Sequence, residues 1–343
     1  MQAPLATLYP IIQAPMAGVQ DFRLAAAISN AGGLGSLPAA MLNTEQLEQA
    51  LLALSEATDN SYNVNFFSHT QPTVQPEQIT RWHEALAPHF AKFNIDPSTL
   101  TGGASRQPFN EAAAEVLERF KPAYVSFHFG LPDKALLERV KRCGSVVISS
   151  ATSTAEAIWL EQNGADIIVA QGLEAGGHRG HFLDRQVEHQ MGTFALLPQV
   201  IAAVSCPVVA AGGIADSKGI NAALTLGACA VQLGTTFLLC DEATTSPLHR
   251  AALQSEDANH TALTNLFSGG AARGIVNGVM RDLGAMNEAA PPFPLASTAI
   301  TALRQAAEAQ NSSDYSPLWC GQNRSGCQSI PAAELLYRLC QDI

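Results

Sequence analysis

The sequence predicts an α/β protein built on a (β/α)8 TIM barrel with an added helical lobe. Short apolar runs alternate with amphipathic helical stretches, and eight such runs lie between residues 10 and 235. This alternation indicates βαβ units and a parallel sheet. The runs are apolar almost throughout, which is typical of strands buried on both faces. Eight units are the number found in a TIM barrel.

Each predicted strand is a short apolar run. In chain order the strands are Pro10–Ala17, Gly33–Leu37, Tyr62–Phe67, Tyr124–Phe129, Ser145–Ser150, Ile167–Gly172, Pro207–Gly213 and Ala230–Thr235. Helical patterns lie between them at Phe22–Ala31, Thr44–Ala57, Asn110–Phe120, Asp133–Cys143, Ser153–Asn163, Phe194–Val204 and Ser217–Leu226. A doubly wound sheet is the alternative, but it usually has fewer strands and a G-x-G-x-x-G sequence after the first. Here the first strand ends in Pro15-Met-Ala-Gly18, which does not match.

Two segments exceed a minimal barrel. Residues 68–109 form a long insertion after the third strand, and residues 240–343 contain helical patterns at Leu295–Gln310 and Ala332–Cys340. We therefore expect residues 1–239 to form the barrel, with 68–109 as its insertion. We expect residues 240–343 to close the barrel and to form a helical lobe that covers the active site.

Composition excludes several classes of partner. Of the 343 residues, 47% are hydrophobic and 14% charged, and the formal net charge is -11. A protein that binds nucleic acid or an anionic membrane surface would show a basic stripe, and none is visible. The first residues lack a basic segment followed by an apolar run, so no signal peptide is predicted. Residues 191–215 are uncharged, but prolines and glycines interrupt them, so a helix and a buried strand fit better than a membrane span.

The cysteine pattern indicates a reducing compartment. Seven cysteines are scattered along the chain, their number is odd, and none forms a C-x-x-C pair. We therefore predict a cytoplasmic protein without disulfides. As a separate expectation, the protein is either a monomer or a homodimer.

A glycine-rich segment follows the sixth predicted strand. It reads Ala170-Gln-Gly-Leu-Glu-Ala-Gly-Gly-His-Arg-Gly180. Glycine allows backbone to approach a ligand closely, and histidine is the side chain whose pKa lies nearest neutrality. Active sites of TIM barrels form at the carboxyl ends of the strands. The segment therefore predicts an active-site loop with His178 as a catalytic base; a solvated glycine turn is the alternative.

The last two strands also end in glycine-bearing loops, Ala210-Ala-Gly-Gly-Ile214 and Val231-Gln-Leu-Gly-Thr-Thr236. TIM barrels commonly bind phosphate in the loops after strands 7 and 8, through backbone N–H groups and a helix N-terminus. The pair of loops predicts a phosphate site. The alternative is that the glycines only relieve crowding where strands turn into helices.

The residues missing from the strand ends also narrow the chemistry. No lysine lies between Lys141 and Lys218, which argues against a Schiff-base mechanism. No cysteine lies between Cys143 and Cys206, so the loop after the sixth strand has no thiol nucleophile. Histidines are present but carboxylates are few, so we expect no metal. A phosphate site, many amides and hydroxyls and one base together predict bound flavin mononucleotide (FMN). Amides such as Asn65 and Gln171 would bond the ring, and the cofactor would supply the redox chemistry.

Several motifs resemble a known family. They are Tyr9-Pro-Ile-Ile-Gln-Ala-Pro-Met-Ala-Gly18, Phe127-His-Phe-Gly-Leu-Pro132, the 170–180 segment, Gly192-Thr-Phe-Ala-Leu-Leu-Pro198, Ala211-Gly-Gly-Ile-Ala-Asp216 and Val231-Gln-Leu-Gly-Thr235. In this order they resemble nitronate monooxygenase, formerly called 2-nitropropane dioxygenase, and most closely its class I members. The resemblance extends to Phe267-Ser-Gly and Ala272-Arg-Gly-Ile-Val-Asn277.

The resemblance implies an FMN-binding TIM barrel that oxidises alkyl nitronates with dioxygen and without nicotinamide. The expected substrate is propionate 3-nitronate, a toxin that would be converted to a carbonyl compound plus nitrite or nitrate. His178 matches the catalytic histidine of the family. The positions implied to contact the flavin are Pro15, Met16, Asn65, Gln171, Gly176, Gly213, Gln232, Leu233, Gly234 and Thr235.

Other side chains have open roles. His128 ends the fourth strand and would either bond substrate or lie in the core, and His181 is the weaker candidate for the base. Glu174 would orient His178 or be solvated. Tyr315 and Trp319 would cap the pocket or pack in the core.

The chain departs from the family where Gly270-Ala271 replace an expected Arg-Pro after Phe-Ser-Gly, and residues 311–322 match only in part. Substrate size is therefore left open. The alternative function is an NAD(P)H-dependent reductase of enoyl thioesters or quinones on the same barrel, which would share the flavin loops and His178. A catalytically silent flavin-binding protein is a third alternative, which the presence of His178 disfavours. Residues 127–132 and Gly192–Pro198 favour the nitronate enzyme.

Overall fold

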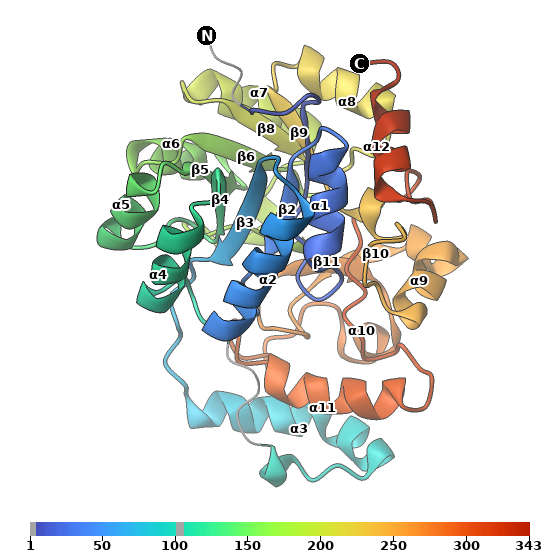
Figure 1. The fold of residues 1–343 in the computed structure, drawn as a ribbon. Helices are drawn as coiled ribbons and strands as arrows, with labels where there is room; N and C mark the ends of the chain where they lie inside the picture. The colour runs from blue at the N-terminus through green and yellow to red at the C-terminus, as the bar shows by residue number, and fades with distance from the viewer. Residues whose placement is uncertain (1–4, 101–105) are drawn as a thin grey trace.

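The computed structural model describes residues 5–100 and 106–343, and its centre is a closed barrel of eight parallel strands (Figure 1). The strands are β1 (Ile11–Gln13), β2 (Gly35–Pro38), β3 (Tyr62–Phe67), β4 (Tyr124–His128), β5 (Val146–Ala151), β6 (Ile167–Gln171), β8 (Val208–Ala211) and β9 (Ala230–Leu233). Their order is β1-β9-β8-β6-β5-β4-β3-β2, and a parallel bridge between Ile12 and Leu34 joins the two ends. The predicted TIM barrel is confirmed, and the doubly wound alternative is wrong.

Seven helices predicted between the strands lie within one residue of their expected ends. They are α1 (Phe22–Asn30), α2 (Thr44–Ala57), α4 (Glu111–Phe120), α5 (Lys134–Arg142), α6 (Thr154–Gln162), α7 (Thr193–Ala203) and α8 (Ser217–Thr225). Most begin at a side chain that accepts a hydrogen bond from a backbone N–H of the first turn, as Asn43 does from Gln46 and Asp216 from Gly219. Such caps satisfy N–H groups that have no partner within the helix. Among the described residues, no helix has the length and hydrophobicity to cross a bilayer.

The first strand is shorter than predicted. It was expected to continue to Ala17, but β1 ends at Gln13 and the chain then turns away from the sheet. Pro15 has no N–H to donate to a neighbouring strand, and the N–H of Met16 donates to Oε1 of Gln20 at 2.8 Å. Ala14 still donates its N–H to the carbonyl of Leu233 at 2.8 Å, whereas residues 15–17 leave the barrel wall and face its open end.

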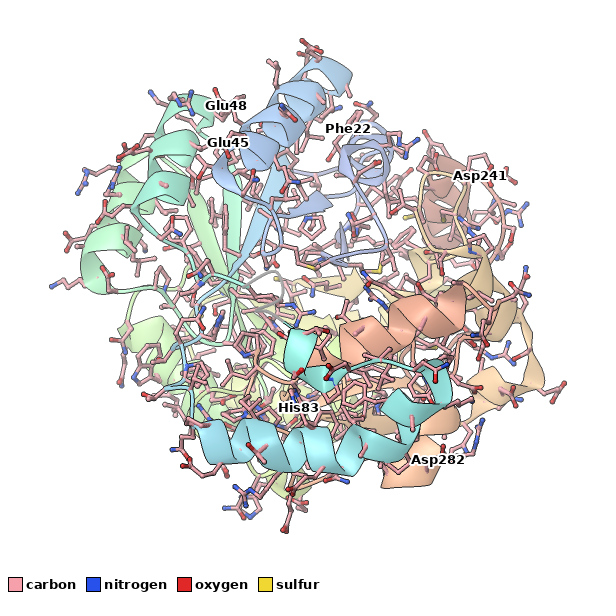
Figure 2. The ribbon with its side chains drawn as sticks, turned by 90° about the horizontal axis from the view of Figure 1, so that it is seen from below. Phe22, Glu45, Glu48, His83, Asp241 and Asp282 are labelled. Carbon is pink, nitrogen blue, oxygen red and sulfur yellow. The ribbon has the colours of Figure 1, made fainter. Side chains whose placement is uncertain are left out.

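The insertion and the C-terminal segment share a hydrophobic core. Helix α3 (Pro76–Phe93) lies beside α11 (Ser297–Glu308), which Figures 1 and 2 show from two sides. Trp82 is 1% exposed and packs in one cluster with Leu86 of the same helix and Leu303 of α11. Helix α12 (Ala332–Cys340) instead packs against α1 on the outside of the barrel. The helices α9 (Pro247–Gln254) and α10 (Gly278–Leu283) and short 3-10 turns at Pro97–Thr99, Val187–His189, Thr235–Phe237 and Glu256–Asn259 complete the elements.

A small antiparallel sheet was not predicted. It consists of β7 (Gly177–His178), β10 (Thr261–Thr264) and β11 (Ala272–Ile275), in the order β10-β11-β7. Two residues are too few to show an alternating pattern, so β7 has no signal in the sequence. The sheet ties the segment that follows β6 to the C-terminal part of the chain. Gly177 and His178 of the predicted active-site loop thus form an edge strand of this second sheet.

Candidate active site

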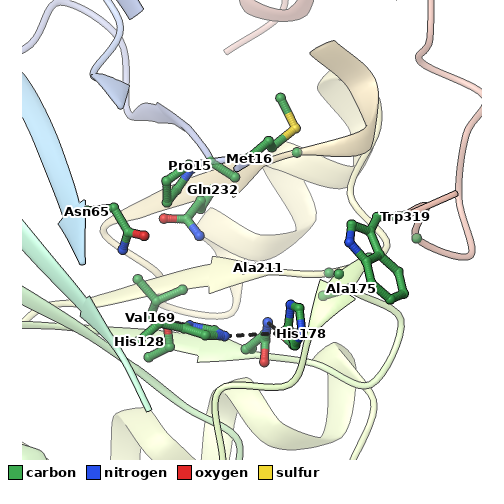
Figure 3. A pocket seen from close by; sticks show the side chains of 18 of the residues that line it. Pro15, Met16, Asn65, His128, Val169, Ala175, His178, Ala211, Gln232 and Trp319 are labelled. Atoms are coloured by element: carbon green, nitrogen blue, oxygen red, sulfur yellow. Dashed lines mark hydrogen bonds between the residues drawn. The ribbon is translucent and has the colours of Figure 1, made fainter. Parts of the chain in front are cut away.

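A pocket lies at the carboxyl ends of the barrel strands and brings almost all predicted site residues together (Figure 3). Its lining includes Pro15, Met16, Asn65, His128, Gln171, Gly176, His178, Gly213, Gln232, Gly234 and Thr235. Figure 3 shows Pro15, Met16, Asn65 and Gln232 on one side and the two histidines on the other. Leu233 is the exception, because its side chain points out of the pocket into the core between the barrel and its helices.

The amide side chains differ in how far the protein already uses them. Nδ2 of Asn65 donates to Oγ of Ser126 at 2.9 Å, which leaves Oδ1 without a protein partner among the described residues. The side chain of Gln232 likewise makes no hydrogen bond to any described residue. Both ends of the Gln171 amide are engaged, since Nε2 donates to the carbonyl of His178 at 3.0 Å and Oε1 accepts from the N–H of Gly180 at 2.8 Å. Gln171 therefore holds the histidine segment in place.

The two glycine loops present backbone N–H groups. Within the described part of the chain, the N–H groups of Gly212, Gly213 and Gly234 donate to no acceptor. An added Cβ on Gly234 would lie 3.4 Å from Cβ of Ala14, which is ordinary van der Waals contact. The protein itself therefore does not require glycine at this position. Free N–H groups beside a short 3-10 turn are suited to hold an anion.

The C-terminal segment completes these loops. The N–H of Gly321 donates to Oγ1 of Thr235 at 2.9 Å, and Nδ2 of Asn323 donates to the carbonyl of Gly213 at 2.8 Å. Neither contact was predicted from the sequence, because the residues are separated by more than 80 positions in the chain.

Glu174 is half-buried and bonds the start of a helix rather than His178. Its carboxylate accepts from the N–H of Thr193 at 2.9 and 3.0 Å and from the Thr193 hydroxyl at 3.0 Å. Thr193 is the first residue of α7, and the preceding Gly192 has no side chain that could cap the helix. Glu174 therefore caps α7 from the neighbouring loop, with a charge that the helix dipole favours.

His178 is held at three points. Its backbone pairs with that of Ala272 in the small sheet, and its ring Nε2 lies 2.8 Å from Oγ of Ser268. Its carbonyl accepts hydrogen bonds from the side chains of Gln171 and His128. Burial and the positive charge of Arg106 lower its pKa well below the ordinary value of 6.5. The imidazole is therefore neutral at neutral pH, which is the state a general base requires.

The other two candidate histidines have different roles. The Nε2–H of His128 donates to the carbonyl of His178 at 3.1 Å, Nδ1 lies 3.3 Å from Oγ of Ser150, and burial lowers the pKa to about 4. Both ring nitrogens of His128 thus face protein groups, although the ring lines the pocket. His181 lies outside the pocket lining, and its Nδ1 is 2.8 Å from Nε2 of Gln190. His178 is the histidine best placed to act as a base.

Aromatic rings form a wall around His178. The centroids of Phe293, Trp319, Phe129 and Phe67 lie 5.3, 5.4, 6.1 and 6.2 Å from the centroid of its imidazole. Trp319 lines the pocket, which agrees with the first of the two roles left open for it, capping the pocket or packing in the core. Tyr315 is core instead: it is 3% exposed and its hydroxyl lies 2.8 Å from Nδ1 of His89.

Arginines are the side chains that sequence reasoning missed. Arg179 is completely buried and donates to the carbonyls of Gln171 and Gly172 at 2.7 and 2.8 Å. Burial lowers its pKa to about 9. The available signal was a charged residue inside the glycine-rich segment, whose carbonyls need donors. Arg106 lines the pocket from the end of the insertion, a region in which no motif pointed to the site.

Comparison with known proteins supports the resemblance. The family model for nitronate monooxygenase matches residues 1–342. The nitronate monooxygenase of Pseudomonas aeruginosa is 40% identical over 97% of this chain and 96% of its own, and a probable nitronate monooxygenase of Bacillus subtilis is 40% identical over 97% and 95%. The crystal structure of nitroalkane oxidase from Streptomyces ansochromogenes superimposes with a TM-score of 0.90 at 36% identity, covering 98% of this chain and 96% of that one.

A more distant structural relative is FabK from Thermotoga maritima. It superimposes with a TM-score of 0.70 at 25% identity, over 99% of this chain and 94% of its own. The barrel is thus shared beyond the family, while the family model and the relatives at 40% identity extend over nearly the whole chain. The chain belongs to the nitronate monooxygenase family of oxidoreductases.

Proposed function

We propose that this protein is an FMN-dependent enzyme that oxidises alkyl nitronates with dioxygen to a carbonyl compound plus nitrite or nitrate. Propionate 3-nitronate is the proposed substrate and its detoxification the proposed role, in the cytoplasm. The observation that carries the proposal is the pairing of two elements in one pocket. Anion-binding glycine loops lie at one part of the lining, and a neutral, firmly held imidazole lies at another.

The residues of the pocket fit FMN. The free N–H groups of Gly213 and Gly234 would hold the phosphate, since the two loops carry no lysine or arginine. Oδ1 of Asn65 and the amide of Gln232 would bond the edge of the ring, and Pro15 would pack against it. When bound, the flavin supplies two-electron redox chemistry; the protein supplies position and electrostatics.

His178 would act on substrates that still carry a proton. A nitronate has already lost its α-proton, so its oxidation needs no base, whereas a neutral nitroalkane must first be deprotonated. For Nδ1 of His178 to accept that proton, Nε2 must carry the ring hydrogen and donate it to Oγ of Ser268. The hydroxyl hydrogen of Ser268 then points to the carbonyl of Gly270 at 3.4 Å. The aromatic wall shields the imidazole from part of the solvent and so helps to keep it neutral.

An NAD(P)H-dependent reductase is the competing function because it would use the same barrel and the same glycine loops. Whole-chain membership of the nitronate monooxygenase family favours the nitronate reaction. Oxygen consumption separates the two functions. The purified protein should consume oxygen rapidly with propionate 3-nitronate and without added NADH or NADPH. Consumption that requires a nicotinamide and is indifferent to nitronate would refute the proposal.

A further inference from the structure

A cationic side chain lies at the same aromatic ring as the proposed base. Arg106 lines the pocket, and its guanidinium carbon is 5.6 Å from the centroid of the Phe293 ring. The centroid of the His178 imidazole is 5.3 Å from the centroid of that ring. The main chain of Arg106 is fixed from the start of the insertion, where Nε2 of Gln71 donates to its carbonyl at 2.8 Å. The backbone of Arg106 is thus held, and its guanidinium lies at the same ring as the imidazole of His178.

This cation has no anionic partner in the described part of the protein. Its Nη1 is buried and makes no hydrogen bond, and no ion pair includes Arg106. Glu174 is the carboxylate among the described lining residues, and it is already bonded to Thr193. The nearby charge that acts on Arg106 is that of Arg304, which is also positive. A buried, unpaired guanidinium is costly unless an anion approaches it.

We propose that Arg106 determines substrate specificity by binding an anionic group at the end of the substrate remote from the nitronate. The inference rests on the proposed function and adds to it the residue that selects a nitronate with a terminal carboxylate. A guanidinium binds a carboxylate through two parallel hydrogen bonds, and such charge-assisted bonds are strong when shielded from water. A short carbon chain would extend from Arg106 along the Phe293 ring to the reaction site. Alkyl nitronates of equal length have no carboxylate and lack this bond.

The phosphate of the cofactor and the nitronate group of the substrate are the other anions that could pair with Arg106. The free backbone N–H groups of the glycine loops favour those loops for the phosphate, and the position of Arg106 beside Phe293 favours the substrate. Loss of flavin on removal of the cation would indicate the phosphate, and an equal loss of turnover with and without a carboxylate on the substrate would indicate the nitronate group.

The test compares Arg106→Met, which keeps the length of the side chain, with Arg81→Met, which removes an exposed arginine from α3 outside the pocket. Oxygen consumption is measured with propionate 3-nitronate and with butyl-1-nitronate, which carries the nitronate charge but no carboxylate. Arg106→Met should lower kcat/KM for propionate 3-nitronate about 10- to 100-fold, mainly through KM, and leave turnover of butyl-1-nitronate and the flavin content unchanged. Arg81→Met should change neither substrate.

Equal losses on both substrates, no loss on either, or loss of flavin from Arg106→Met would overturn the inference. A second readout is independent of nitronate turnover: binding of succinate, followed by the fluorescence of Trp319 and the other tryptophans. Succinate should bind the wild type and bind Arg106→Met at least 10-fold more weakly. If nitronate turnover failed while this difference held, the proposed reaction would be wrong and the anion site correct. If turnover held and the difference were absent, the anion site would be wrong.

Discussion

Replacement of His178 by asparagine separates proton removal from the redox step. Asparagine retains a polar side chain of modest size, but it has no basic nitrogen. The pKa of His178 lies well below 6.5, so at pH 7 the wild-type imidazole is unprotonated and fully available as a base. General-base catalysis is typically worth about 10²–10⁴-fold. We expect His178→Asn to lose turnover of neutral nitroethane by that factor and to keep most of its activity on ethyl nitronate.

The assay is oxygen consumption with each of the two forms of the substrate, on protein whose flavin content has been measured. His181→Asn is the matched control, since His181 lies outside the pocket lining, and it should leave both activities unchanged. Ser268→Ala should reduce nitroethane turnover by a smaller factor than His178→Asn, because it removes the group that fixes the ring hydrogen on Nε2. Equal loss of both substrates in His178→Asn, with flavin retained, would show that His178 orients substrate rather than taking its proton.

Two further predictions concern the cofactor and stability. Gly234→Ala should weaken FMN retention without lowering the melting temperature of the apoprotein, because the new Cβ meets only ordinary contacts within the protein; Gly219→Ala on α8 is the control, and equal flavin content in both variants would contradict the assignment of this loop to the phosphate. Stability should fall as pH decreases from about 6.5 towards 4, because burial lowers the pKa of His69, His128, His181 and His249 to about 4. The unfolded chain binds protons in this range that the folded chain does not. Each histidine therefore adds up to about 1.4 kcal/mol per pH unit to the pH dependence of the free energy of unfolding. The free energy of unfolding of His249→Gln, measured by urea denaturation at several pH values, should depend less steeply on pH than that of the wild type. An identical pH dependence in the two proteins would refute this account.

The barrel could be predicted from the sequence because its elements are local. Each of the seven helices and eight apolar strands can be recognised from a window of about ten residues, through its periodicity and its helix caps. The strand ends then follow, and with them the position of Asn65, Gln232 and His178 around one pocket. Polar residues at the ends of buried parallel strands must converge in this fold.

The rest of the site depends on contacts between distant segments, which no local pattern reveals. The pairing of His178 with Ala272 involves a two-residue strand, and the contacts of Gly321 and Asn323 cross most of the C-terminal segment. Arg106 lines the pocket from the end of the insertion, whose helix α3 packs on α11 far along the chain. The contact of Glu174 with Thr193 was not among the alternatives for the same reason, since Thr193 lies beside it only in the folded chain.

Anaerobic titration of the purified protein tests the central claim most directly. The claim is that the pocket holds FMN and that nitronate, rather than a nicotinamide, reduces it. With oxygen removed, propionate 3-nitronate should bleach the visible flavin absorbance to completion, and an equal concentration of NADH should leave it unchanged over the same time. Rapid bleaching by NADH with none by nitronate would contradict the account and would identify a reductase on this barrel.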